Sequence, residues 1–223
     1  GDADKMVQMA GPGESVSTAY DREISKRTQR FIREDAQNVS DKPWTLFVSF
    51  VCPHFPLTAP KEFYDLYEGI DLPMPRQYAE EERPTHPYLQ DYRNTFAYDD
   101  HFKSVEDVQR AMRGYLGLVS FIDAQVGAIV AALCETDQLS NTRIVYTSDH
   151  GDNLGTRGLW GKSNMYEESA GIPLIVAGPD IPSGETRSEL RSLIDVSRFV
   201  VESAGLDGEA FGEQDLFGPS NAP

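Results

Sequence analysis

The chain has 223 residues, of which 39% are hydrophobic and 25% are charged, and its formal net charge is −16. This length and composition are ordinary for one globular α/β domain. The negative charge repels phosphate backbones and so argues against a nucleic-acid partner, and no run approaches the about 18 consecutive apolar residues of a membrane-spanning segment.

The N-terminal region predicts a loose segment followed by a helix. Residues 1–16 contain glycine and proline but no hydrophobic period, so we expect a loose lead-in there. Ile24 and Phe31 then fall on one face at helical spacing. Thr18 and Asp21 precede that face and are residue types that cap helix N-termini, so we expect a helix to begin beside them.

A short buried strand is predicted at residues 45–51. Their sequence, TLFVSFV, is apolar and rich in strand-forming residues, and Pro53 ends the run. Residues 52–103 are rich in proline, tyrosine, histidine and acidic side chains, with little periodicity beyond a short helix near 61–67. Long irregular excursions of this kind often shape a binding site.

The second half of the chain predicts helices that alternate with strands. A sustained apolar stripe marks a long helix from Ser104 to about residue 136, and Gly114, Gly117 and Gly127 within it predict a close contact with a sheet. The further expected elements are strands at 143–149 and 172–179, a helical patch near 164–169, a helix at about 192–204 and a tail at 207–223. Strands without polar alternation indicate an α/β fold, with a mostly parallel sheet and helices on both faces.

Asp149 and His150 follow the strand predicted at 143–149. Ligands of open α/β sheets bind beyond the carboxyl ends of the strands, and a carboxylate beside an imidazole can address one divalent cation. The alternative is that Asp149 and Gly151 only make the turn. Asp152 and Arg157 lie nearby and either support the metal ligands without binding the cation or are solvated.

Two further candidates are His54, within PHFP, and Lys162, within GLWGKS. Flanking prolines restrain the backbone of His54, so its ring is suited to contact a substrate oxygen. A lysine is a compact cation suited to an anionic group, and in a partly buried site about 4 Å away its attraction to a unit charge is about 4 kcal/mol. Taken alone, each of these residues is more often an ordinary surface group.

In order along the chain, the motifs CPHFP, YTSDHGD, GLWGK, YEES and IPLI resemble those of the sulfatases of the alkaline phosphatase superfamily. The resemblance extends from about Tyr20 to Leu206. It implies an α/β fold of the alkaline phosphatase type that is incomplete. The partial catalytic domain then covers residues 17–206, with a lead-in at 1–16 and a tail at 207–223.

The resemblance also implies roles for the four candidates. Asp149 is similar to a carboxylate ligand of the family's divalent cation, and His150 occupies the neighbouring ligand position, where many sulfatases have asparagine. Calcium is the usual cation in the family, while an imidazole ligand suits manganese or zinc better. His54 resembles the catalytic histidine that contacts the sulfate and assists the leaving oxygen, and Lys162 the catalytic lysine that binds the sulfate. The implied substrates are small-molecule or glycan sulfate esters.

The chain departs from the family pattern in several places. The family's nucleophile is a cysteine in a C-x-P-x-R or S-x-P-x-R pattern, oxidised to formylglycine, and this sequence has no such pattern. Cys52 is followed directly by Pro53 and lacks the arginine. Two metal-binding aspartates of the first strand, an upstream Lys/His pair and the small C-terminal subdomain are also unmatched.

We therefore expect a sulfatase fragment that is inactive by itself. The alternatives are a phosphonate or phosphodiester hydrolase of the same superfamily and a non-catalytic module with that fold. Loss of a neighbouring strand would leave an exposed edge or apolar patch, from which we expect self-association.

Overall fold

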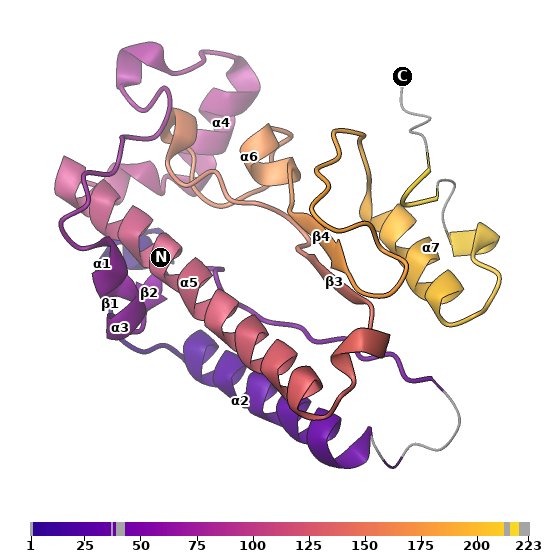
Figure 1. Ribbon diagram of the computed structural model, residues 1–223. Helices are drawn as coiled ribbons and strands as arrows, with labels where there is room; N and C mark the ends of the chain where they lie inside the picture. Colours follow the sequence, from indigo (N-terminus) through magenta and orange to yellow (C-terminus); the bar gives the residue numbers. More distant parts are fainter. Residues whose placement is uncertain (1, 37, 39–42, 212–214, 219–223) are drawn as a thin grey trace.

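The computed structural model describes residues 2–36, 38, 43–211 and 215–218. Figure 1 shows α5 (Val105–Glu135) running along the length of the molecule, with α2 (Val16–Arg30) beside it. On the other side, β3 (Ile144–Thr147) and β4 (Leu174–Ala177) form a small sheet. The structure therefore combines helices with short sheets, as an α/β fold does.

Residues 1–16 contain regular structure rather than the loose lead-in expected. The helix α1 spans Asp2–Gln8, and β1 (Gly11–Pro12) pairs in parallel with β2 (Thr58–Ala59). The physical reason is tertiary: the Met6 side chain is buried in the main hydrophobic core. A single buried side chain and a two-residue strand are too short to produce a hydrophobic periodicity, so the sequence pattern does not reveal them.

The helix predicted after residue 16 is confirmed, but its cap is not the predicted one. Ser15 is the N-cap: its hydroxyl accepts a hydrogen bond from the Thr18 backbone N–H, and the Thr18 hydroxyl accepts one from the Ser15 backbone N–H. Asp21 lies a turn further along and is fully buried. The helix continues as a π-helical turn at Phe31–Asp35.

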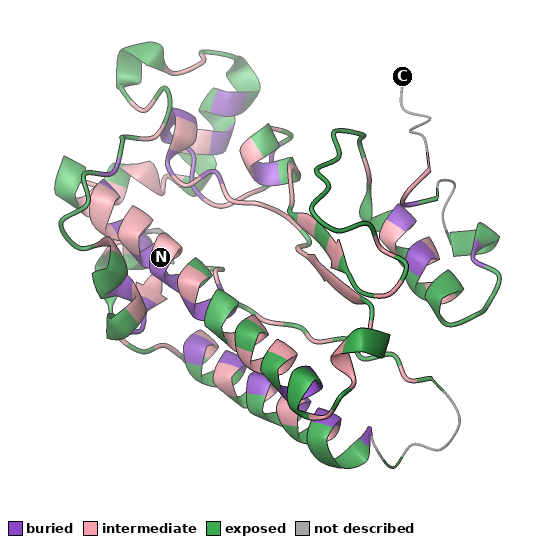
Figure 2. Cartoon of the chain, in the orientation of Figure 1, coloured by how far each residue is buried: buried purple, intermediate pink, exposed green. Residues whose placement is uncertain are grey.

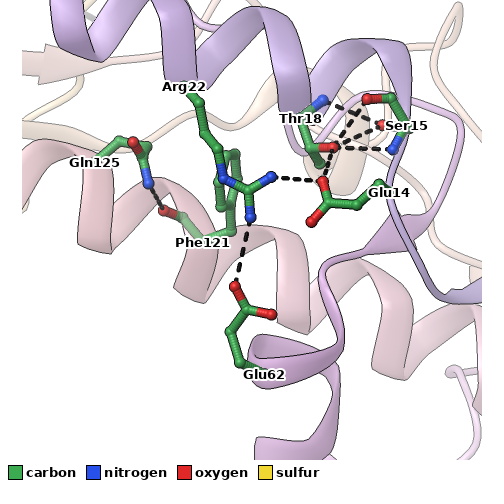
Figure 3. A network of polar contacts seen from close by, with 7 residues as sticks. All are labelled: Glu14, Ser15, Thr18, Arg22, Glu62, Phe121 and Gln125. Carbon is green, nitrogen blue, oxygen red and sulfur yellow. Dashed lines mark hydrogen bonds and ion pairs between the residues drawn. The ribbon is translucent and has the colours of Figure 1, made fainter.

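A cluster around Arg22 fixes α2 against its neighbours (Figure 3). The Arg22 guanidinium lies 2.5 Å from a Glu14 carboxylate oxygen and 3.4 Å from one of Glu62, and 5.1 Å from the centre of the Phe121 ring on α5. The hydrogen bond from Arg22 lowers the pKa of Glu14. These contacts are partly exposed, so they set the orientation of α2 more than they stabilise the fold.

The long helix predicted from Ser104 is confirmed as α5, with Ser104 as its N-cap. The close contact predicted at its glycines is confirmed for Gly114 and Gly117 and is wrong for Gly127, where an added Cβ atom would meet nothing within 4 Å. A Cβ atom on Gly114 would lie 2.2 Å from the carbonyl oxygen of Leu57, and one on Gly117 would lie 2.8 Å from the Cβ atom of Ala59 in β2. These two positions have room for glycine alone.

The helix α5 is long and apolar enough on average to cross a membrane. The sequence analysis looked for an unbroken run of apolar residues and did not anticipate this. A single such helix is weak evidence for a membrane segment, since core helices of globular proteins pass the same test. Here α5 contacts α2, α3 (Lys61–Tyr64) and β2. Its buried side chains Val108, Leu118 and Phe121 belong to the main core.

The strands predicted at 143–149 and 172–179 are confirmed as β3 and β4, but they pair antiparallel, with Ile144 opposite Ala177. The chain leaves the C-terminal end of β3 and enters β4 at that same end of the pair, which makes the strands antiparallel. A parallel pair would need a connection that crosses back to the N-terminal end of β3. Of the strand pairs in the described part of the chain, only the short pair β1–β2 is parallel. Among the described residues, the mostly parallel sheet that we predicted is therefore replaced by two small pairs.

The strand predicted at residues 45–51 is wrong. This segment has no regular secondary structure, and Phe47 is 89% exposed. A strand needs a neighbour that exchanges backbone hydrogen bonds with it, and none of the described strands pairs with this segment. The exposed apolar side chains of residues 45–51 remain the reason to expect self-association.

The remaining helices surround these elements. The excursion at 52–103 contains the predicted helix near 61–67 as α3 with a 3₁₀ turn after it, and also a helix that the sequence analysis missed, α4 (Pro87–Phe96). The predicted later helices are confirmed as α6 (Glu167–Ala170) and α7 (Leu193–Ser203). Figure 2 shows buried residues concentrated along α2 and α5, while β3 and β4 are intermediate or exposed.

Candidate active site

His54 and Lys162 meet in the structure although 108 positions separate them in the sequence. The Lys162 ammonium donates a hydrogen bond to His54 Nε2 over 2.5 Å. On the other side of the ring, His54 Nδ1 lies 3.0 Å from the carbonyl oxygen of Phe55. A carbonyl only accepts, so Nδ1 carries the proton and Nε2 is the acceptor that faces the lysine.

His150 lies beside this pair. Its ring centre is 6.1 Å from that of His54, and its Nδ1 donates to the carbonyl of Gly151 over 2.8 Å. In the neutral ring, that hydrogen bond places the proton on Nδ1 and leaves Nε2 as the acceptor; Nε2 lies 3.6 Å from Asp149 Oδ2. The Asp149 side chain is 82% exposed. The four candidates therefore gather in one region, with Asp149 at its outer margin.

All four side chains line one groove of about 2150 Å³. The unpaired segment at 43–55, the apolar face of α5 and β3 form its walls. Tyr92 and Phe96 of α4 also border it. The site is thus a broad groove that contains the four candidates and is bordered by aromatic side chains of α4.

Lys162 is held through its backbone. Asp152 Oδ1 accepts hydrogen bonds from the backbone N–H groups of Leu154 (2.8 Å) and Gly161 (3.1 Å), and the Tyr92 hydroxyl donates to the Lys162 carbonyl. Burial raises the pKa of Asp152, although these amides and the nearby lysine act in the opposite direction. Asp152 is therefore held inside the loop that carries Lys162 rather than solvated, and its hydrogen bonds go to that loop.

Arg157 also supports the loop rather than facing solvent. Its guanidinium donates to Glu168 over 2.9 Å and lies 3.9 Å from the centre of the Tyr166 ring. Arg76 binds the same glutamate over 2.8 Å. Burial raises the pKa of Glu168, but its hydrogen bonds, including the one from Arg157, bring it below its ordinary value. The cluster attaches the loop before Lys162 to α6.

The proposed metal ligands suit a cation in type but not in number. Asp149 and His150 offer a carboxylate oxygen and an unprotonated imidazole nitrogen, donors that divalent cations accept. Zinc in proteins usually has about four ligands and calcium about six to eight. Within the described ranges, no group of three or more His, Cys, Asp or Glu side chains gathers at one point.

Cys52 has the properties of a buried structural thiol. Burial, together with a hydrogen bond to the Asp21 carboxylate, raises the pKa of this thiol. A protonated, inaccessible thiol is a poor nucleophile. This agrees with the sequence-based interpretation that Cys52 is not the nucleophile of the family pattern.

Comparisons with known proteins identify the fold. A phosphonate monoester hydrolase from Silicibacter pomeroyi aligns with 96% of this chain and 46% of its own, with a TM-score of 0.69 at 24% identity. The structure of BT4656 in complex with its substrate D-glucosamine-2-N,6-O-disulfate aligns with 93% of this chain and 51% of its own, with a TM-score of 0.66 at 21% identity. The chain therefore shares the alkaline phosphatase-like fold of these two structures.

The sequence defines the family within that fold. The sulfatase family model matches residues 3–206. The choline-sulfatase of Rhizobium meliloti is 36% identical over 194 residues, which are 85% of this chain and 38% of the relative. The chain belongs to the sulfatase family. It spans less than half the length of the curated relative.

The sequence analysis missed Asp21 and Tyr92, which hold the backbone near the two candidate catalytic residues. The sequence does contain a pattern that indicates the role of Asp21. The buried face of α2 is a stripe of polar residues at helical spacing, namely Thr18, Asp21, Ser25 and Thr28. A polar stripe on a buried face indicates that the helix packs against backbone groups that need hydrogen-bond partners.

Proposed function

We propose that this chain is the part of a sulfatase catalytic domain that binds the sulfate group through His54 and Lys162. In the proposal, Asp149 and His150 are two of the ligands of a divalent cation. The observation that carries it is the 2.5 Å contact of Lys162 with His54 Nε2 inside the groove, in a chain of the sulfatase family.

The chemistry of sulfate ester hydrolysis explains why these groups are needed. In the proposal, a nucleophile that this chain does not supply forms a bond to sulfur as the S–O ester bond breaks. Negative charge resides on the sulfate oxygens and develops on the leaving oxygen. The Lys162 ammonium compensates the charge of the sulfate. In the proposal His54 acts in its imidazolium form, in which Nε2 also carries a proton. It donates a hydrogen bond to the leaving oxygen and then transfers that proton to it, which returns the ring to the neutral form with Nε2 as an acceptor. Loss of one positioned donor of this kind typically lowers kcat about 10²–10³-fold.

Sulfatases generally use a divalent cation, and we place two of its ligands on this chain. When bound, such a cation stabilises the charge on the sulfate oxygens. The Nδ1–H···O=C bond from His150 to Gly151 fixes the tautomer that leaves Nε2 available as a ligand. Because calcium prefers oxygen donors, an imidazole here favours manganese or zinc over calcium. Further ligands have to come from elsewhere in the full polypeptide.

The proposed substrates are small-molecule or glycan sulfate esters. Support comes from the choline-sulfatase relative and, at the level of fold alone, from the structure with a disulfated glucosamine. The alternative is a phosphonate monoester or phosphodiester, because a histidine–lysine pair accepts any tetrahedral oxyanion. A curated relative from Trinickia caryophylli, 30% identical and named as a multifunctional alkaline phosphatase superfamily protein, keeps this alternative open.

The test uses the intact protein, that is, the full polypeptide in which residues 1–223 occur. Hydrolysis of an aryl sulfate and of an aryl phosphonate monoester is compared for the wild type, Lys162→Ala and His54→Ala. Each variant is expected to lose kcat/KM about 10²–10³-fold, while Lys26→Ala, an exposed lysine on α2, retains it. Faster phosphonate cleavage would favour the alternative substrate. Absence of both activities in the wild type would favour a non-catalytic module.

A further inference from the structure

We infer that Asp21 on α2 is a positioning residue for His54, an inference that rests on the proposed function of that histidine. Asp21 is fully buried, yet it lies in the middle of a helix, where a carboxylate needs partners to remain buried. It touches no candidate catalytic side chain. Its role is to hold the backbone turn from which His54 extends.

Both carboxylate oxygens of Asp21 are used by consecutive backbone amides. The Val51 N–H donates to Oδ1 and the Cys52 N–H donates to Oδ2, each over 2.8 Å. Hydrogen bonds to a charged acceptor are about twice as strong as neutral ones. One side chain therefore fixes two successive peptide units, 30 positions further along the chain.

His54 is directly connected to these two units. Its backbone N–H donates to the Val51 carbonyl over 3.0 Å, which closes a turn of four residues. The contact of its ring with the Phe55 carbonyl then directs Nε2 toward Lys162. The position of the His54 ring thus depends on the first two residues of the turn, and Asp21 holds both of them.

The surroundings explain why a carboxylate is needed here. The segment at 43–51 exchanges no ladder hydrogen bonds with any described strand, so a sheet does not hold its end in place. In contrast, α2 is fixed by the contacts of Arg22 with Glu14 and with the Phe121 ring (Figure 3). The Cys52 side chain is buried in the main core, and Asp21 adds two hydrogen bonds that connect the backbone of the turn to this fixed helix.

Hydrogen exchange on the 223-residue chain tests the contact directly. We expect the amides of Val51 and Cys52 to be protected in the wild type. Asp21→Asn turns one acceptor into a donor, so their exchange should accelerate about tenfold to a hundredfold. The control is Ser25→Ala, buried on the same face of α2 and bonded to Gln29 instead of the turn, and it should leave both rates unchanged. Unprotected amides in the wild type would overturn the inference even if Asp21→Asn failed to fold.

A double-mutant cycle in the intact protein tests the consequence for His54. Asp21→Asn is expected to lower kcat at least about tenfold, and the double variant with His54→Ala should be no slower than His54→Ala alone. Independent, multiplicative losses would show that Asp21 does not act through His54. If His54→Ala kept full activity, the proposed function itself would fail. If only Asp21→Asn kept full activity, the positioning role alone would fail.

Discussion

The contact between α5 and the segment after the His54 turn is so close that one added methyl group should disrupt it. In Gly114→Ala, the new Cβ atom would lie 2.2 Å from the Leu57 carbonyl oxygen, whereas ordinary contacts begin at 3.4 Å. The two backbones therefore have to separate by about 1.2 Å. Overpacking of this kind typically costs about 1–3 kcal/mol.

Gly127 of the same helix is a matched control. A Cβ atom there meets nothing within 4 Å, so Gly127→Ala should gain the helix propensity of alanine, about 1 kcal/mol. Gly114→Ala gains the same helix propensity, so the free energies of unfolding of the two variants should differ by the overpacking cost alone, about 1–3 kcal/mol. For a chain of this size, each kcal/mol corresponds to about 2–4 °C in Tm.

Thermal unfolding of the wild type and both variants, followed by far-UV circular dichroism, measures this difference. Gly114→Ala should unfold below the wild type and Gly127→Ala above it. Equal Tm values for the two variants would refute the close packing of α5 against the segment at Leu57, and with it the scaffold on which the His54 turn rests.

Three further predictions concern the chain as a whole. A thiol reagent should label exposed Cys134 rapidly and buried Cys52 only on unfolding, so two equally fast thiols would contradict the burial of Cys52. The pKa values of Glu14 and Glu168 lie below the ordinary 4.5 in the folded chain. Their contribution to stability is therefore present above pH 4.5 and is lost as the pH falls through the folded-state pKa values. An unchanged Tm between pH 7 and pH 3.5 would contradict this. Millimolar manganese or calcium should leave the Tm of the 223-residue chain unchanged, because the proposed ligand pair is incomplete, and a rise of several degrees would show a complete site.

Sequence patterns identified the elements whose own residues determine them. The long apolar stripe of α5 and the short apolar runs of β3 and β4 are local signals, and each element lies where it was predicted. The run at 45–51 has the same local signal but no pairing partner among the described residues, so it forms no strand. Strand formation depends on a neighbour, which a local pattern does not reveal.

The candidate site was predictable in part. Family motifs indicated His54 and Lys162, and the structure brings them into contact. Asp21 was misinterpreted as a cap because its function depends on backbone amides far along the chain. The role of Tyr92 was missed because α4 is short and was not predicted. In addition, the Tyr92 hydroxyl binds the backbone carbonyl of Lys162, and no sequence motif indicates such an interaction.

A structure of the intact protein with a sulfate ester bound in the groove would test the central claim most directly. Oxygen atoms of the ester group should lie within about 2.7–3.2 Å of both His54 Nε2 and Lys162 Nζ. An ester bound elsewhere, with neither nitrogen in contact, would contradict the account.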